Sequence, residues 1–428
     1  MSIVLLLVAP VIVGVIGALH WYVWRRLVRD TTRPGTRWRR LGTALFVAAP
    51  TLMLVALVGA RAGLPFWLVR VLSWPAYLWL ALALYLLLAV LVGEAVRPPL
   101  VRWLRHRAAR RAPAATPEPA AAAPGAAPAP SDTAPPSTAP DDREGDDDRE
   151  ASAELSRRVF AARLVGGAAA AVAVGTVGYG TYGVLRGPRV KRVTVPLAKL
   201  PRAAHGFRIA VVSDLHLGPV LGRGFAERVV ATVNATQPDL IAVVGDLVDG
   251  SVADLGRSVE PIGRLQARHG TFFVTGNHEY LSGAAEWTAH VRELGLGLLA
   301  NERVELPSFD LAGVNDVAGE DYEDGPDLAA ALADRDPARA SVLLAHQPVF
   351  VDEAVRHGVD LQLSGHTHGG QLWPVNHLAG LANPTVAGLE RYGDTQLYVS
   401  RGAGAWGPPT RVGAPSDVTV VELASRQA

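Results

Sequence analysis

Three long uncharged stretches near the start of the chain limit the environments in which it can fold. They cover residues 3–24, 41–60 and 71–93, and none of them contains Asp, Glu, Lys or Arg. A helix of about 20 apolar residues crosses the hydrocarbon core of a bilayer, whereas helices of soluble domains usually carry charges on one face. Trp24 ends the first stretch, where an aromatic ring suits the membrane interface. The sequence therefore predicts a three-span, all-α transmembrane region over residues 1–111.

The Arg residues between these stretches indicate how the region is oriented. Residues 25–40 contain seven Arg and residues 97–111 another six, whereas the loop over residues 61–70 contains two. Short loops rich in Arg and Lys stay on the cytoplasmic side of a membrane. We therefore expect the two Arg-rich segments in the cytoplasm and the N-terminus outside.

Residues 112–155 differ in composition, with Ala and Pro followed by the acidic run DDREGDDDRE. Their net charge is −8, against +13 for residues 1–111 and −4 for residues 156–428. A segment with almost no large apolar side chain cannot bury a core, so we predict a disordered linker on the cytoplasmic side. The acidic run could instead bind a partner, although a solvated spacer explains it more simply.

Residues 156–192 combine an export-like motif with a weakly apolar stretch. The segment begins with SRRVF, and residues 164–185 are uncharged but rich in Ala, Gly and Val. Paired Arg before a modestly apolar helix resembles a twin-arginine signal, which predicts the twin-arginine translocase as a partner, a fourth span and an extracytoplasmic domain beyond it. Four basic residues follow within residues 186–192 and oppose this interpretation. If the stretch does not span, the domain faces the cytoplasm.

The composition excludes several classes of site. The chain has no Cys, which rules out disulfide bonds, Cys metal ligands and a Cys nucleophile. Only two of its 41 basic residues are Lys, and the C-terminal half has no basic stripe with interleaved aromatic residues. A nucleic-acid-binding patch is therefore not expected.

From about residue 193 the chain alternates short β-rich runs with helical stretches. The runs expected to be strands are Arg208 to Ser213, Leu240 to Val244, Thr271 to Val274, Ser341 to Ala345, Leu361 to Leu363 and Gln396 to Val399. Phe225 to Asn234 has the pattern of a helix. This alternation predicts an α/β domain over residues 193–428, whose site is built on loops after the strand ends.

Polar motifs follow these predicted strands in a fixed order. They are DLH with Asp214 and His216, GD with Asp246, GNHE with Asn277 and His278, AHQP with His346, and GHTH with His366 and His368. Carboxylate and amide oxygens together with imidazoles suit Mn, Fe or Zn. Residues two apart on extended backbone point the same way, so each pair within DLH and GHTH can face one ion.

This ordered set resembles the calcineurin-like metallophosphoesterase family over roughly residues 208–423, and GDLVDG, HTHGGQ and LYVSRGAG resemble its bacterial membrane-associated branch. The resemblance implies a four-layer αββα sandwich that holds two divalent metal ions. Carried over motif by motif, the implied ligands are Asp214, His216 and His368 for one ion, Asn277, His346 and His366 for the other, and Asp246 as the bridge. Two cations about 3.5–4 Å apart suit an in-line displacement, with a bridging hydroxide as the implied nucleophile.

The remaining polar residues of the motifs are expected to assist. His278 has no metal assignment and is the candidate general acid for the leaving oxygen. Glu279 either orients His278 or is a surface carboxylate, and Asp249 and Gln371 are interpreted as supporting residues. Arg401 either meets the substrate phosphate or forms an ion pair. The segment PTRVGAPSD departs from the family pattern near the last strand, so we expect the residues around the substrate to differ from those of the family.

Three functions are compatible with these features. The first is a membrane-anchored, extracytoplasmic phosphoesterase that acts on a phosphodiester, a phosphomonoester or a pyrophosphate, most simply as a phosphodiesterase, on a substrate that is free or lipid-linked. The second is a cytoplasmic-face pyrophosphatase or phosphodiesterase that cleaves a nucleotide-linked glycolipid. The third is a non-catalytic membrane scaffold with a vestigial metal site, which the complete set of ligands disfavours.

Overall fold

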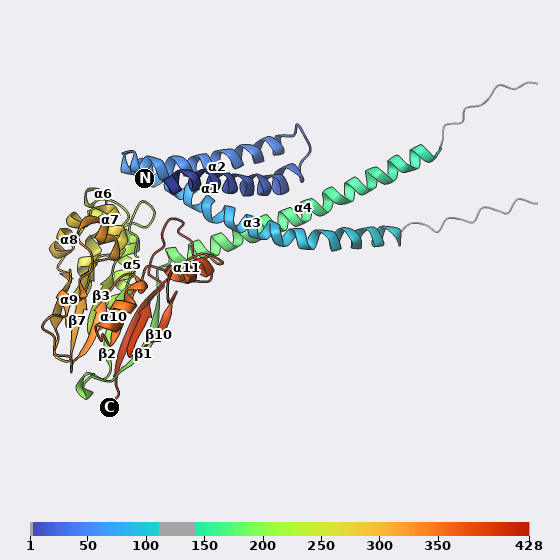
Figure 1. Ribbon diagram of the computed structural model, residues 1–428. Helices are drawn as coiled ribbons and strands as arrows, with labels where there is room; N and C mark the ends of the chain where they lie inside the picture. Colours follow the sequence, from blue (N-terminus) through green and yellow to red (C-terminus); the bar gives the residue numbers. More distant parts are fainter. Residues whose placement is uncertain (1–2, 111–141, 428) are drawn as a thin grey trace, which may run out of the picture. The chain divides into compact units, whose positions relative to one another are not determined.

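The computed structural model describes residues 3–110 and 142–427 (Figure 1). Contacts divide the chain into two units, one with residues 1–46 and 85–173 and the other with residues 47–84 and 174–428. The second unit contains the α/β domain and the C-terminal end of the last long helix.

Long helices form the N-terminal part of the chain. They are α1 (Ile3–Trp24), the π-helical turn η1 (Arg25–Arg29), α2 (Arg37–Arg61), α3 (Phe66–Ala109) and α4 (Asp142–Leu185). By length and composition, three helical segments among the described residues can cross a membrane, namely Arg37–Gly59, Phe66–Arg107 and Ser156–Leu185. These contain the predicted stretches 71–93 and 164–185 and all but the last residue of 41–60, while α1 covers the stretch 3–24.

The predicted linker over residues 112–155 differs from the structure at its end. Residues 142–155 form the first turns of α4, while residues 112–141 lie outside the described part of the chain. Acidic residues near a helix N-terminus are stabilised by the helix dipole, which favours a helix that starts in the acidic run. Glu154 also forms an ion pair with Arg158 one turn later, with 2.6 Å between Oε1 and Nη2.

Two mixed sheets of six strands form the C-terminal domain. The first sheet has the order β1 (Arg189–Leu197), β12 (Asp417–Ser425), β2 (Phe207–Val212), β3 (Leu240–Val244), β4 (Thr271–Val274) and β5 (Gly297–Leu298). The second has the order β10 (Gly388–Tyr392), β11 (Thr395–Val399), β9 (Leu361–Ser364), β8 (Ala340–Leu344), β7 (Phe309–Gly313) and β6 (Glu302–Glu305). Strands from the two ends of the domain sequence meet in the first sheet, where green β1 lies beside red β12 in Figure 1.

Shorter helices connect the strands. They are η2 (Arg202–Ala204), α5 (Arg223–Asn234), α6 (Val252–Val259), η3 (Glu260–Arg264), α7 (Asn277–Ser282), α8 (Ala284–Glu293), η4 (Val317–Tyr322), α9 (Leu328–Ala331), η5 (Pro348–Phe350), α10 (Val351–Arg356), η6 (His368–Gly370) and α11 (Asn376–Ala382). The strands and the helix expected from the sequence all form, the strands with ends within one residue of the predicted ones and the helix with a start two residues earlier.

Alternating side chains along the central strands define four layers. In β2, Val211 belongs to the core between the sheets, whereas Val212 belongs to the core under α5, α6 and α8. In β8, Val342 likewise faces the first sheet, while Leu343 packs with residues of α9 and α10. Because successive side chains of a strand point to opposite faces, each sheet is buried on both sides. The predicted αββα sandwich is therefore confirmed.

Candidate metal centre

The polar motifs converge on one edge of the domain. Strands β2, β3 and β4 run parallel in the first sheet, and β7, β8, β9 and β11 run parallel in the second. The carboxyl ends of parallel strands lie at the same edge of a sheet, which is where α/β folds build their sites. Three groups of ligand atoms within 4.8 Å of one another lie here among the described residues, and they are Asp214 with His216 and His368, His216 with Asp246 and His278, and Asp246 with His346 and His366.

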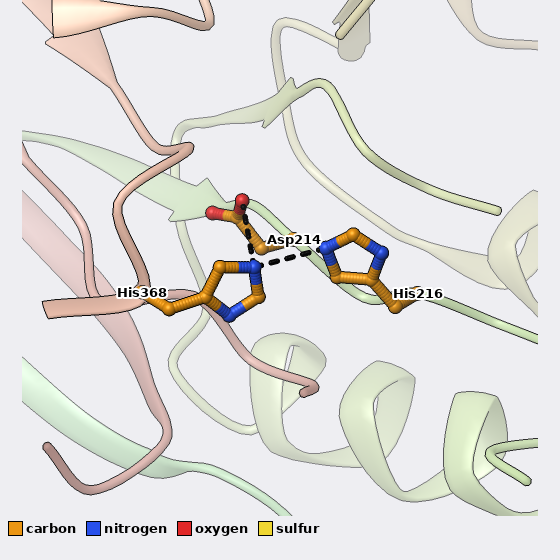
Figure 2. Close-up of side chains that lie close together, drawn as sticks. All are labelled: Asp214, His216 and His368. Carbon is orange, nitrogen blue, oxygen red and sulfur yellow. Dashed lines mark hydrogen bonds and ion pairs between the residues drawn. The ribbon is translucent and has the colours of Figure 1, made fainter. Parts of the chain in front are cut away.

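The first group joins a loop of each sheet (Figure 2). Nε2 of His216, after β2, lies 2.9 Å from Nε2 of His368, after β9. Nε2 of His368 is also 3.5 Å from Oδ1 of Asp214. All three side chains are buried. Two imidazole nitrogens this close must share a proton or a cation, so the three residues fit a cation held between the two sheets.

The third group, Asp246 with His346 and His366, contains a buried nitrogen that has no hydrogen-bond partner. This group and the first are called the two ligand groups below. Nδ1 of His346 lies 2.8 Å from the carbonyl oxygen of Val244, which can only accept, so in the neutral ring that a metal ion requires Nδ1 carries the proton and Nε2 presents a lone pair. That Nε2 is buried without a hydrogen bond and lies 3.2 Å from Oδ2 of Asp246. Oδ1 of Asn277 lies 3.0 Å from Nδ1 of His366. A nitrogen lone pair that makes no hydrogen bond and lies beside a carboxylate is suited to bind a second cation.

Asp246 lies between the two groups. Its Oδ2 is 3.6 Å from Nε2 of His216 and 3.2 Å from Nε2 of His346. Burial alone would raise the pKa of Asp246, but the adjacent imidazoles of His346 and His216 outweigh burial and hold that pKa well below its usual range. Asp246 is therefore a carboxylate within reach of both groups, which suits the bridging role predicted for it.

The backbone at these ligands adopts an uncommon conformation. Asp214, His216, Asp246, His366 and His368 all have positive φ angles, between 47° and 71°. Residues other than Gly avoid this left-handed region, and such strain concentrates at functional sites. Two Gly residues leave room for the carboxylates of Asp246 and Asp214. A Cβ at Gly276 would lie 2.3 Å from Oδ1 of Asp246, and one at Gly365 would lie 2.4 Å from Oδ2 of Asp214.

Asp249 connects the metal centre to His278. Its Oδ1 lies 3.0 Å from Nδ1 of His216 and 2.7 Å from Nδ1 of His278. Burial opposes ionisation of Asp249, but His216 and His278 outweigh it and lower its pKa to about 2. A carboxylate at Nδ1 of His216 turns Nε2 toward the metal position, as outer partners of metal ligands usually do. The supporting role expected of Asp249 thus takes the form of a double contact.

The surroundings of His278 favour its protonated form. Its ring is 13% exposed, and its backbone N–H donates to Oδ1 of Asp246 at 2.9 Å. Burial acts to lower the pKa of His278, but the hydrogen bond to Asp249 and the charge of Asp246 outweigh burial and raise that pKa. His278 belongs to one of the three ligand groups, so its geometry allows either a metal contact or the predicted acid role.

Glu279 has neither of the roles considered from the sequence. It is fully buried, and its carboxylate accepts the N–H of Asp246 at 3.0 Å, of Leu247 at 2.8 Å and of Gly276 at 2.6 Å. Burial, followed by the charge of Asp246, raises the pKa of Glu279 to about 7. Glu279 therefore fixes the GD and GN loops to each other and does not orient His278.

Arg411, in the segment PTRVGAPSD, has a role that was not predicted. Its buried guanidinium donates to the carbonyl oxygens of Gly404 at 2.7 Å and of His368 at 3.0 Å, and its Nη2 lies 3.0 Å from Nδ1 of His368. Arg401, in contrast, lies alongside Gly369, where a Cβ would be 3.1 Å from Cγ of Arg401. Sequence spacing carries no signal for the position of Arg411, because its partner His368 is 43 positions earlier in the chain.

Gln371 has the supporting role expected of it. Its side-chain amide donates to the carbonyl oxygens of Trp406 at 2.9 Å and of Pro408 at 3.1 Å, and its Oε1 accepts the N–H of Trp406 at 2.9 Å. These bonds hold the loop of residues 406–413 against the loop that carries His368.

Comparison with known proteins gives one family. Residues 207–370 match the family model described as calcineurin-like phosphoesterase. An uncharacterized metallophosphoesterase of Helicobacter pylori is 38% identical over 247 residues, which are 57% of this chain and 66% of that protein. A transmembrane protein with metallophosphoesterase domain from Danio rerio is 36% identical over 259 residues, 57% of this chain and 59% of that protein.

A third relative is covered almost completely. An uncharacterized metallophosphoesterase of Aquifex aeolicus is 35% identical over 240 residues, which are 55% of this chain and 91% of that protein. The match to the first two relatives spans 66% and 59% of their length. With three helical segments apolar enough to cross a bilayer, and a relative named as a transmembrane protein, the chain is a membrane protein.

Proposed function

The chain belongs to the calcineurin-like metallophosphoesterase family, and from this premise we propose that it is a membrane-anchored hydrolase of phosphoester bonds that works with two divalent metal ions. One observation carries the proposal. Carboxylate and imidazole groups from loops of both sheets converge within 4.8 Å at one edge of the domain, buried and with an unpaired imidazole nitrogen among them. A vestigial scaffold has no need of such a set, because buried polar groups are costly to keep.

The proposed ligand sets follow the two groups at this edge. Asp214, His216 and His368 would hold one ion, Asn277, His346 and His366 would hold the other, and Asp246 would contact both. Oxygen and imidazole donors suit Mn, Fe or Zn. When bound, two such ions polarise the phosphate group and supply a hydroxide at neutral pH. The chain contributes fixed positions for the donor atoms, most of which belong to buried side chains.

His278 is the proposed proton donor to the leaving oxygen. Its raised pKa favours the protonated ring, and Asp249 fixes the orientation of the ring through Nδ1 at 2.7 Å. Nε2 is then the nitrogen that can give up a proton. General acid catalysis of this kind contributes about 10² to 10⁴ in rate. The turnover should fall as the pH rises through the pKa of His278.

The test is hydrolysis by the full-length protein purified in detergent. We expect Mn²⁺-dependent turnover of bis(p-nitrophenyl) phosphate, and a comparison with p-nitrophenyl phosphate measures the preference for diesters. His278→Ala should lower kcat by about 10² to 10⁴ without loss of bound metal. His205→Ala, at an exposed histidine outside the motifs, is the matched control and should behave as the wild type. Absence of turnover in the wild type, or equal turnover in both variants, would contradict the proposed chemistry.

We further propose that α1 to α4 each cross the membrane and that the domain lies outside the cytoplasm. The seven Arg of residues 25–40 and the six of residues 97–111 support a cytoplasmic side for these loops. Arg157 and Arg158 lie within α4 ahead of its apolar part, where a twin-arginine signal would be read. The alternative is a domain on the cytoplasmic face that cleaves a nucleotide-linked glycolipid.

Reporter fusions after Val193 separate these two topologies. An export-dependent alkaline phosphatase should be active there and a cytoplasm-dependent fluorescent protein dark. Arg157→Lys with Arg158→Lys keeps the charge and should abolish the phosphatase signal if the twin-arginine route is used. Fluorescence of the second reporter with an inactive phosphatase would instead favour the cytoplasmic alternative.

A further inference from the structure

One exposed apolar surface lies beside the metal centre, on α11 and the loop of residues 406–413. We call it the α11 surface and define it by Val375, Leu378, Leu381 and Trp406, which are 37%, 65%, 84% and 59% exposed. Three of these residues are spaced by three positions and share one helix face. The chain has no Asp, Glu, Lys or Arg between Asp360 and Glu390. Exposed apolar patches of this kind mark interaction sites on soluble domains and on domains held at membranes.

The α11 surface is built onto the loop that carries His368. A Cβ at Gly370 would lie 2.2 Å from Cα of Asn376, so the start of α11 touches the backbone of that loop. Gln371 holds Trp406 through its amide, as described above, and the Trp406 ring lies 5.7 Å from the His278 ring. A molecule that rests on this surface therefore lies next to the proposed proton donor.

The loop of residues 406–413 also contacts the end of α4. Oγ1 of Thr181 lies 2.8 Å from Oγ1 of Thr410, and the N–H of Arg411 donates to the carbonyl oxygen of Gly180 at 3.3 Å. Tyr179 and Tyr182, on either side of this contact, are 75% and 63% exposed. Exposed Tyr residues near the end of an apolar helix are typical of the membrane interface. The contact thus ties the loop of Trp406 to the interfacial turn of α4.

We propose that the α11 surface inserts into the bilayer that α4 crosses, at the level where α4 leaves it. Leu378 and Leu381 reach the acyl chains, while Trp406 lies among the headgroups, which is where indole rings are favoured. Exposed Arg186 follows α4 directly and attracts anionic headgroups. On the proposed function, the metal centre then opens onto the phosphate layer, and its substrate is a phosphoester carried by a membrane lipid.

The absence of Cys from the chain permits a direct test of the insertion. Full-length Leu381→Cys is labelled with bimane and reconstituted into vesicles of equal parts phosphatidylcholine and phosphatidylglycerol. Its emission should shift to the blue, and phosphatidylcholine brominated in its acyl chains should quench it. The control is Val355→Cys, at an exposed apolar residue of α10 that is 38% exposed, whose label should stay accessible to aqueous iodide. Equal iodide quenching at both positions, without a blue shift at 381, would overturn the proposal.

Two further measurements complete the test. Leu378→Asp in the Leu381→Cys background should lower the bromolipid quenching, because a charge on the surface opposes insertion. Energy transfer between differently labelled Leu381→Cys copies, persisting on dilution with lipid, would show that a second copy covers the surface and would contradict insertion. Turnover of bis(p-nitrophenyl) phosphate by the labelled protein tests the chemistry separately, since the label reports insertion whether or not the protein is active.

Discussion

The two sheets contribute different chemistry to the one centre. In the proposed ligand sets, the first sheet brings all three oxygen donors, Asp214, Asp246 and Asn277, together with one imidazole, whereas the second brings three imidazoles. The carboxylates also hold backbone: Asp214 accepts the N–H of His366 at 3.0 Å, across the sheets. The imidazole of His346 holds backbone as well, since its Nδ1 donates to the carbonyl oxygen of Val244. The difference between the sheets therefore lies in charge, because losing a carboxylate removes a negative charge from the centre and losing an imidazole does not. Variants of residues from each sheet test this difference.

Asp246→Asn should have the largest effect. It removes the charge that faces both ligand groups, and also weakens the acceptor of the His278 N–H. We expect kcat/KM to fall by more than about 100-fold, the upper range for losing only an outer partner of a metal ligand. Bound metal, measured by mass spectrometry, should fall as well. Asp394→Asn, at a fully exposed carboxylate, is the control, and an Asp246→Asn protein with wild-type metal content and turnover would contradict the account.

His346→Gln tests the second sheet. It removes the unpaired Nε2 and leaves the carboxylates of the first sheet in place. We expect a loss of about 100-fold that excess Mn²⁺ partly restores, since one donor of a set is missing rather than the shared charge. Turnover as a function of Mn²⁺ concentration measures this. If excess metal restores Asp246→Asn but not His346→Gln, the contrast between the sheets is wrong.

Asp249→Asn should have a smaller effect of about 10- to 100-fold. Asp249 raises the pKa of His278, so its neutralisation should lower that pKa and move the alkaline limb of the pH–rate profile to lower pH. A role confined to folding would lower the amount of active enzyme without moving the limb. The pH dependence of kcat decides between these outcomes.

Glu279→Gln should affect stability more than chemistry. Three backbone N–H groups lose a carboxylate acceptor, which costs about 1–3 kcal/mol in the free energy of unfolding. Because the folded pKa of Glu279 is raised to about 7, its protonation favours the folded state below the unfolded pKa near 4.5, and this contribution is lost as the pH rises through 7. The thermal stability of the wild type relative to the variant should therefore decline between these pH values.

Much of this arrangement can be predicted from the sequence, because strands and motifs are local signals. The apolar runs that end in DLH, GD and GHTH gave the strands and the positions of the ligands. Glu279 and Arg411 escaped prediction because most of their partners are backbone groups, N–H donors for Glu279 and carbonyl acceptors for Arg411, and backbone groups leave no pattern in a sequence. The helix over residues 142–155 was missed because the composition of that segment, which is poor in large apolar residues, indicates disorder and carries no signal of continuity with the following helix.

The most direct test of the central claim is a metal titration of the full-length protein stripped by a chelator. The account predicts no turnover of bis(p-nitrophenyl) phosphate without metal, and turnover that rises steeply only as the second Mn²⁺ per chain is bound. Turnover by the metal-free protein, or full turnover with a single ion bound, would contradict the claim that the two sheets assemble one two-metal centre.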